Sequence, residues 1–190
     1  PKLDELLELS SKNLSQDIII NLEIKSTPDE KNLTPNPKEM VQIVLNDIKK
    51  SNLQDKIIIS SFDWRILREV KNQSPEISRA YLTFQQEKGM KIKKTIYSKS
   101  PWIDHIPLTI VYDLPKIIKE LGGSAWHPYY KDINKKAVKD AHDYNLPVNV
   151  WTVNDEYNML KMIEYEVDGI MTDYPLKLKE LCDKKNIKWF

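Results

Sequence analysis

The sequence has few of the residues that build disulfide scaffolds, phosphate-binding loops or membrane spans. Its 190 residues include a single cysteine, Cys182, and four glycines. A disulfide framework is therefore excluded, and so is a Gly-x-Gly-x-x-Gly nucleotide loop. No run of about 20 apolar residues is present, so we expect no transmembrane segment. The lone cysteine fits a reducing compartment but does not decide the location. We expect the cytoplasm, and a periplasmic or secreted location stays open.

An excess of charge of either sign is also missing. Twenty-nine basic residues against 28 acidic ones give a net charge of +1. No overall field would attract nucleic acid, and we expect no nucleic-acid partner. Hydrophobic residues make up 41% and charged residues 30% of the chain, the balance of an ordinary globular protein. The length predicts a single domain over residues 1–190.

The sequence does contain a regular alternation of apolar β-branched runs and helical apolar stripes. The six predicted strands are residues 18–24, 57–59, 77–82, 124–126, 148–153 and 167–172. A helical pattern follows each strand, and a further helical stripe precedes the first. Such alternation is typical of right-handed βαβ units with a parallel sheet.

Six units are too few for a closed (β/α)₈ barrel of about 250 residues. We therefore predict an α/β fold of TIM-barrel type, here an incomplete barrel of about six βα units that starts within a repeat. An open doubly wound sheet is the alternative, and the missing glycine-rich loop disfavours its nucleotide-binding form. A long lysine-rich loop, about residues 83–113, is inserted after the third strand. It is interpreted as a solvated insertion with a small satellite cluster, or as a lid or membrane-contacting loop.

The first predicted strand carries polar side chains at its carboxyl end. Because side chains alternate along a strand, Asn21, Glu23 and Lys25 share one face. Parallel-sheet enzymes place their sites at this end of the strands. Glu23 is a candidate ligand for a hard divalent cation, and Lys25 a candidate anchor for an anionic oxygen. The alternative is a plain ion pair between the two.

Aromatic and acidic residues near later strands give weaker signals. Trp151 lies near the exit of the strand at residues 148–153, where an indole could line a pocket or fill the top of a barrel. Asp63 and Asp173 each precede a predicted helix. Both are interpreted as N-caps, and the alternative for Asp173 is a place at the pocket mouth.

The three histidines form no motif. His105, His127 and His142 are scattered and have no metal-ligand spacing. His142 lies in a helical pattern and is predicted to face solvent. His127 follows a predicted strand and could reach a pocket rim.

Five segments in order resemble one enzyme family over nearly the whole chain. They are PKLDE at residues 1–5, NLEIK at 21–25, SSFD at 60–63, VWTVN at 150–154 and VDGIMTDYP at 167–175. Each is similar to a motif of the glycerophosphodiester phosphodiesterase family. The resemblance implies a (β/α)₈ barrel that uses a divalent cation to hydrolyse small-molecule glycerophosphodiesters to an alcohol and glycerol 3-phosphate. It also implies that Glu23 binds the metal, that Lys25 is the active-site lysine and that Trp151 is the pocket aromatic.

The sequence departs from the family at its start. The family's His-Arg-Gly segment, Glu-x-Asp metal pair and second histidine precede the segment that begins here at Pro1. The resemblance therefore implies that the catalytic residues, unknown in this sequence, lie before Pro1. We expect the chain alone to bind Mg²⁺ or Ca²⁺ weakly if at all and to be inactive. Open strand edges would then favour self-association.

Two alternatives to a truncated phosphodiesterase stay open. One is a non-catalytic remnant or a subunit that completes a barrel with a second polypeptide. The other is a phospholipase D-like lipid-cleaving relative of the same superfamily.

Overall fold

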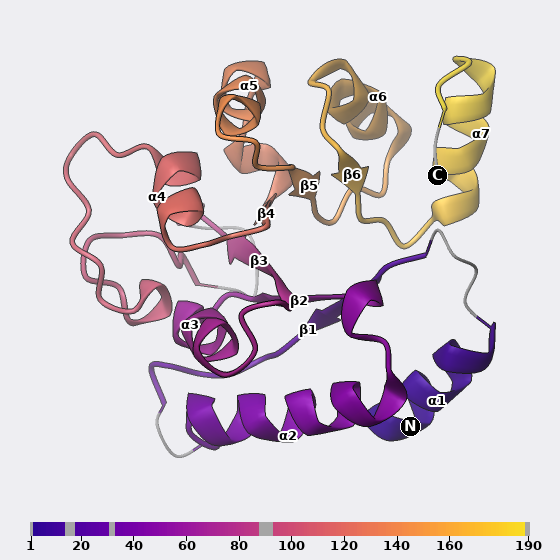
Figure 1. Cartoon of the computed structure of the whole chain (residues 1–190). Coiled ribbons are helices and arrows are strands. Elements are labelled where there is room, and N and C mark those ends of the chain that lie inside the picture. The colour runs from indigo at the N-terminus through magenta and orange to yellow at the C-terminus, as the bar shows by residue number, and fades with distance from the viewer. Residues whose placement is uncertain (1, 14–17, 31–32, 88–92, 189–190) are drawn as a thin grey trace. The chain divides into compact units, whose positions relative to one another are not determined.

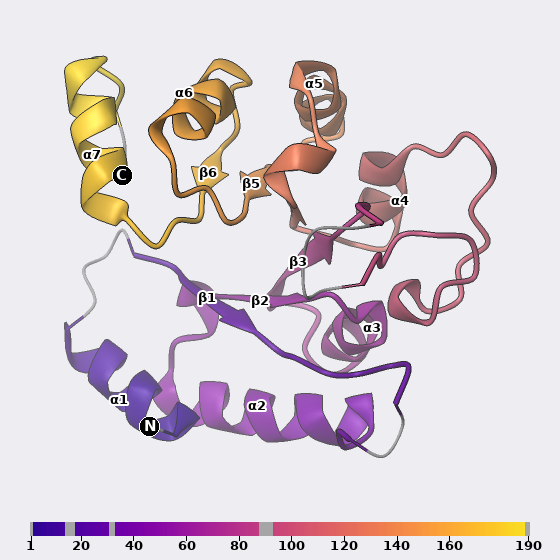
Figure 2. The ribbon, with the colours of Figure 1, turned by 180° about the vertical axis from the view of Figure 1, so that it is seen from behind.

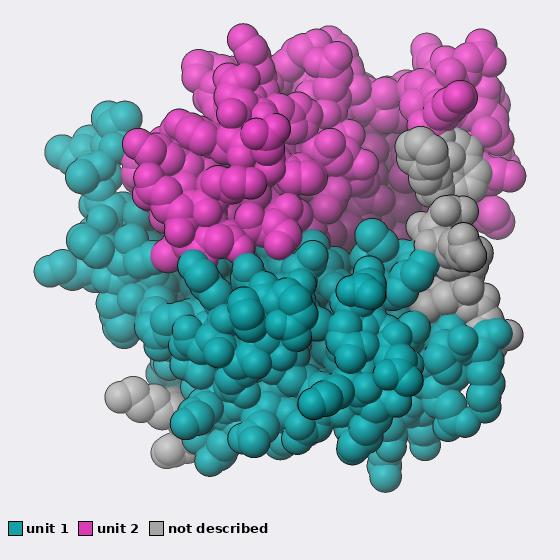
Figure 3. Space-filling view, in the orientation of Figure 1, with its two compact units in different colours: residues 1–81, 95–111 teal, residues 82–94, 112–190 magenta. Residues whose placement is uncertain are grey.

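The computed structural model describes residues 2–13, 18–30, 33–87 and 93–188, in which strands and helices alternate along the chain (Figure 1). The chain divides into two units (Figure 3). Unit 1 comprises Pro1–Tyr81 and Thr95–Val111, and unit 2 comprises Leu82–Lys94 and Tyr112–Phe190. This division does not test the single domain expected over residues 1–190, which stays a prediction.

Unit 1 is built on parallel strands. Its helices are α1 (Leu3–Asn13), α2 (Pro37–Ser51) and α3 (Trp64–Gln73), and its strands are β1 (Ile20–Glu23), β2 (Ile57–Ser61) and the start of β3 (Ser78–Thr83). β1 pairs in parallel with β2, with Glu23 opposite Ser60, and β2 pairs in parallel with β3. Short 3₁₀ helices cover Gln54–Lys56 and Pro101–Ile103. Figures 1 and 2 show α2 and α3 on one side of these strands.

Unit 2 repeats the strand–helix pattern. Its elements are α4 (Leu114–Glu120), β4 (Ala125–Pro128), a 3₁₀ turn (Tyr130–Asp132), α5 (Lys135–Asp143), β5 (Asn149–Val150), α6 (Glu156–Glu164), β6 (Gly169–Ile170) and α7 (Pro175–Lys184). β5 and β6 pair in parallel, and parallel bridges join the β4 and β5 segments. The last two residues of β3 belong to this unit, where the Thr83 carbonyl accepts the Tyr129 N–H at 3.1 Å.

Many of the buried residues of each unit come from the predicted strands and from the apolar stripes of the predicted helices. In unit 1, Ile59 of β2 is buried against the apolar face of α3, which carries Ile66, Leu67 and Val70. In unit 2, Val148 and Val150 are fully buried. Each buried aliphatic side chain contributes about 1.5–3 kcal/mol. All six predicted strands are present, and a helix follows each of them, but three strands are shorter than predicted. β1 covers Ile20–Glu23 within the predicted range 18–24, β5 covers Asn149–Val150 within 148–153, and β6 covers Gly169–Ile170 within 167–172.

The loop at about residues 83–113 divides between the units, and part of it, residues 88–92, lies outside the described residues. Its second part belongs to unit 1, where Ile96 and Ile103 are buried. The Trp102 indole Nε1 donates to Asp29 Oδ2 at 3.1 Å. Asp104 forms an ion pair with Arg68 of α3. Residues 95–111 are therefore part of unit 1 and contribute buried side chains to it. None of the helices in the described ranges is long and apolar enough to cross a membrane.

Candidate active site

An acidic and a basic side chain, Glu23 and Lys25, lie at the carboxyl end of β1. Glu23 ends the strand, and its Oε2 lies 3.7 Å from Lys25 Nζ. The Lys25 side chain is 81% exposed and that of Glu23 is 31% exposed. Burial raises the pKa of Glu23 above its usual value, against the opposing effect of Lys25. The two side chains form a loose ion pair, so both retain polar atoms that can contact a ligand.

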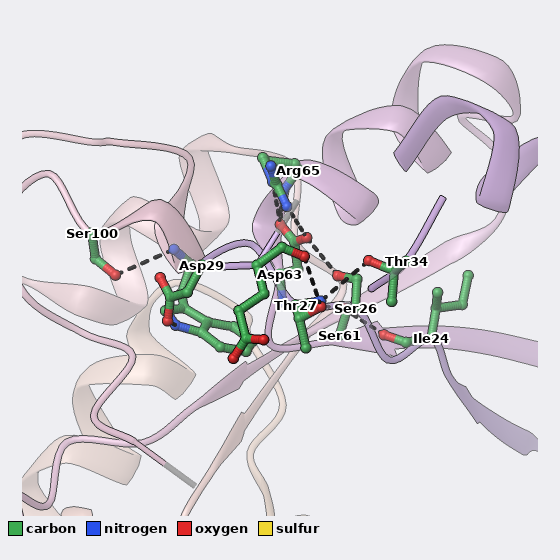
Figure 4. A network of polar contacts seen from close by, with 11 residues as sticks. Ile24, Ser26, Thr27, Asp29, Thr34, Ser61, Asp63, Arg65 and Ser100 are labelled. Atoms are coloured by element: carbon green, nitrogen blue, oxygen red, sulfur yellow. Dashed lines mark hydrogen bonds and ion pairs between the residues drawn. The ribbon is translucent and has the colours of Figure 1, made fainter. Parts of the chain in front are cut away.

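The chain on either side of Lys25 is fixed by hydrogen bonds (Figure 4). The Ile24 N–H donates to the Ser60 carbonyl at 2.9 Å, and Ser61 Oγ donates to the Ile24 carbonyl at 2.7 Å. Ser26 Oγ donates to Asp63 Oδ2 at 2.5 Å. Contacts to β2 and to the start of α3 therefore hold the residues that flank Lys25.

Asp63 has the predicted role and a second one. Its Oδ1 accepts the Arg65 N–H at 3.1 Å, so it is the N-cap of α3, as expected. The Arg65 guanidinium donates to both carboxylate oxygens, at 2.9 and 2.7 Å, and the hydrogen bond raises the pKa of Arg65. Asp63 is completely buried. Sequence reasoning missed its link to Ser26, for which the only local signal was a serine directly after Lys25.

Trp151 lies in an aromatic cluster of unit 2. Its indole is 7% exposed and stacks at tilted angles with Tyr129 and Phe84, with ring centroids 5.2 and 6.2 Å away. Its Nε1 donates to the His127 carbonyl at 2.8 Å. The indole N–H therefore already has a hydrogen-bond acceptor within the protein. A ligand could contact only the ring of Trp151. Trp151 belongs to a different unit from Glu23 and Lys25, so their shared pocket stays a prediction.

His127, whose carbonyl binds the Trp151 indole, is buried and does not lie on an exposed rim. The residue is 1% exposed, and burial lowers its pKa to about 4. Its Nε2 lies 3.0 Å from Asn149 Nδ2, while Nδ1 has no hydrogen-bond partner among the described residues. A Cβ at Gly169, on the neighbouring strand, would clash with the Asn149 side chain, so a larger residue there would displace that side chain. The imidazole is neutral near pH 7 and is not poised to transfer protons there.

One other sequence interpretation needs correction. Asp173 does not cap α7, because Tyr174 is at the N-cap position and its N–H donates to Thr172 Oγ1 at 3.0 Å. The Asp173 carboxylate instead accepts from Asn154 Nδ2 at 2.7 Å. His142 is exposed, as predicted, and its Nε2 lies 2.8 Å from Asp168 Oδ2. These two contacts join residues that are 19 and 26 positions apart in the sequence.

The described residues supply only some of the ligands that a cation needs. Within the described ranges, no group of three or more histidine, cysteine, aspartate and glutamate side chains is arranged to hold a metal ion. Glu23 offers one carboxylate, whereas Mg²⁺ and Ca²⁺ take six or more oxygen ligands. The described residues therefore do not form a complete cation site.

Comparison with known proteins gives a consistent result. The Glycerophosphoryl diester phosphodiesterase family matches residues 1–177. The Glycerophosphodiester phosphodiesterase of Caldanaerobacter subterraneus is 30% identical over 97% of this chain and 62% of its own length. A crystal structure from Silicibacter pomeroyi, named as a candidate glycerophosphoryl diester phosphodiesterase, is 31% identical with a TM-score of 0.82, over 100% of this chain and 58% of that one.

A third similarity shows the fold alone. An Oleispira antarctica phosphodiesterase, solved in complex with sn-glycerol-3-phosphate, is 23% identical with a TM-score of 0.70, over 96% of this chain and 61% of that one. The predicted fold class, α/β of TIM-barrel type, is confirmed by these structures. The chain spans about three fifths of the length of the relatives it matches.

Proposed function

Because the chain belongs to the glycerophosphoryl diester phosphodiesterase family, we propose that it serves the hydrolysis of glycerophosphodiesters to an alcohol and glycerol 3-phosphate. The observation that carries the proposal is the Glu23–Lys25 pair, which stands at the carboxyl end of a parallel strand inside the matched region. The Oleispira antarctica relative was solved with sn-glycerol-3-phosphate, which is the product class proposed here.

Each of the three residues has a chemical role in this proposal. Lys25 places its positive charge next to a phosphoryl oxygen. Negative charge develops on that oxygen as the ester bond breaks, and the lysine stabilises it. Glu23 offers a carboxylate oxygen to a cation. The ring of Trp151 packs against the apolar face of the glycerol or the alcohol group. The three residues are assigned charge stabilisation, cation binding and packing, so the proton transfers need other groups.

The cation belongs to the proposal as well. When bound, a divalent cation offsets negative charge on the phosphoryl group. The remaining oxygen ligands would come from a further polypeptide segment, from water or from the substrate, because the described residues supply too few. We propose Mg²⁺ or Ca²⁺, bound weakly if at all by this chain alone.

We further propose that the chain needs a segment carrying the family's His-Arg-Gly and Glu-x-Asp motifs. The length of the matched relatives supports this, since the chain spans 62% of the Caldanaerobacter protein. The two motifs would supply the catalytic histidines and the missing carboxylates. The chain together with that segment, fused ahead of Pro1 or added as a second polypeptide, is called the extended protein below.

The test is a hydrolysis assay with glycerophosphocholine and glycerophosphoethanolamine. We expect no detectable release of glycerol 3-phosphate by residues 1–190, and metal-dependent release by the extended protein. Removing the cation with EDTA should abolish the release, and adding Mg²⁺ or Ca²⁺ should restore it. Equal turnover by residues 1–190 alone would contradict the need for the segment. An inactive extended protein would instead favour the non-catalytic subunit.

Strand edges in each unit lead to a prediction about assembly. β1 stands at one end of its sheet and β6 at one end of its two-stranded sheet. Edge strands offer unpaired backbone groups to another chain. We therefore propose that the 190-residue chain self-associates, with a mass by light scattering that rises with concentration. A monomer at every concentration would contradict this proposal.

A further inference from the structure

We infer that Ser26 and Asp63 are positioning residues that act through Lys25. The inference rests on the proposed function, because it assigns to these two residues the task of holding the lysine at the phosphoryl group. Neither residue is given a contact with substrate. The contacts that support the inference all lie within unit 1 (Figure 4).

The first step concerns the residue before Lys25. Both backbone groups of Ile24 are bonded to β2: its N–H donates to the Ser60 carbonyl at 2.9 Å, and its carbonyl accepts from Ser61 Oγ at 2.7 Å. Ile24 is 5% exposed. The backbone directly before Lys25 is therefore held in place, although β1 itself ends at Glu23.

The second step concerns the residue after Lys25. Ser26 is 8% exposed, and its hydroxyl donates to the buried Asp63 carboxylate at 2.5 Å. Hydrogen bonds to charged acceptors are shorter and stronger than neutral ones. Lys25 thus lies between two anchored neighbours, while its own side chain is 81% exposed.

The third step concerns Asp63, which is itself held in place. Arg65 donates to both carboxylate oxygens, and the Asp63 N–H donates to Ser61 Oγ at 3.1 Å. Ser61 is the same side chain that binds the Ile24 carbonyl. One network therefore joins the start of α3, the end of β2 and both neighbours of Lys25.

This arrangement suits a flexible cationic side chain. A lysine has four rotatable methylene groups, so its ammonium can reach a ligand reproducibly only if its Cα is fixed. Misplacing a catalytic group by about 1 Å can lower a rate by about 100-fold. The N-cap and the Arg65 pair would stabilise α3 without Ser26. The Ser26 hydroxyl therefore serves the segment that carries Lys25.

The test is a double-mutant cycle in the extended protein with Ser26→Ala and Lys25→Met. We expect Ser26→Ala to lower kcat about 10-fold and to change KM less. In the Lys25→Met background, Ser26→Ala should have no further effect on kcat, because the group it positions is gone. Ser51→Ala is the matched control, since Ser51 Oγ donates to the Ile48 carbonyl at the end of α2. Unchanged kcat, or an equal loss in both backgrounds, would overturn the inference.

Hydrogen exchange of the 190-residue chain gives a second test that needs no activity. We expect Ser26→Ala to speed amide exchange at residues 24–27 and to leave α3 unchanged, while Ser51→Ala leaves residues 24–27 unchanged. Unaltered exchange at residues 24–27, or faster exchange throughout α3, would overturn the inference. If Lys25→Met keeps full activity, the role proposed for Lys25 fails. If Lys25→Met is impaired and Ser26→Ala is not, only the inference fails.

Discussion

Replacing Lys25 by methionine in the extended protein is expected to lower kcat about 100-fold, with a smaller change in KM. Methionine keeps most of the length and apolar character of the lysine stem and removes the ammonium. The lost interaction is one that strengthens as charge develops on the phosphoryl oxygens, and removing one such donor typically costs about 10²–10³ in kcat. Initial rates with glycerophosphocholine over a range of substrate concentrations give both constants.

A matched control separates this effect from a change in surface charge. Lys12 is an exposed lysine of α1 that pairs with Glu8 at 2.7 Å. Lys12→Met removes the same charge away from the end of β1 and should leave kcat unchanged. If Lys25→Met retains kcat within about twofold, Lys25 has no role in transition-state stabilisation.

Acid is expected to destabilise unit 2 through His127. Burial lowers the pKa of His127 in the folded protein to about 4, against an ordinary value of 6.5. Between these values the unfolded chain takes up a proton that the folded chain does not. The stability associated with neutral His127 is thus complete above pH 6.5 and is lost as the pH falls toward 4. The loss by pH 4 is about 3 kcal/mol.

His127→Gln isolates this effect. Glutamine keeps a polar group beside Asn149 and cannot take up a proton. Urea unfolding followed by tryptophan fluorescence at pH 7, 5.5 and 4 should show a steeper loss of stability for the unsubstituted chain than for the variant. His105→Gln, at an exposed histidine of unit 1, serves as the control. Parallel pH profiles for the unsubstituted chain and His127→Gln would show that His127 is not protected from protonation.

Local sequence patterns were enough for the elements and for one of the two predicted caps. Ile57–Ile59 predicted β2 because β-branched runs favour strands, and Asp63 predicted the start of α3 because its partner lies two residues away. Asp173 occupies a similar position before α7. Its prediction failed because Asn154 binds the carboxylate, and Pro175, two residues further on, has no N–H for it to accept.

In the candidate site, too, the sequence predicted local features but not contacts between residues far apart in the chain. Alternation along β1 placed Glu23 and Lys25 on one face, and the structure brings their charged atoms to 3.7 Å. Ser26 and Asp63 are 37 residues apart, and no local period links them. The burial of His127 likewise depends on β5, which contributes Asn149 from 22 residues further along the chain. Contacts of this range depend on strand order and register, which a periodic pattern does not specify.

The central claim is that Glu23 and Lys25 belong to a site that cleaves glycerophosphodiesters. The most direct measurement is ³¹P NMR of glycerophosphocholine incubated with the extended protein and Mg²⁺ or Ca²⁺. We expect loss of the phosphodiester signal and growth of a single glycerol 3-phosphate signal, at a rate that falls about 100-fold with Lys25→Met. A persistent phosphodiester signal, or a phosphocholine product in place of glycerol 3-phosphate, would contradict the claim.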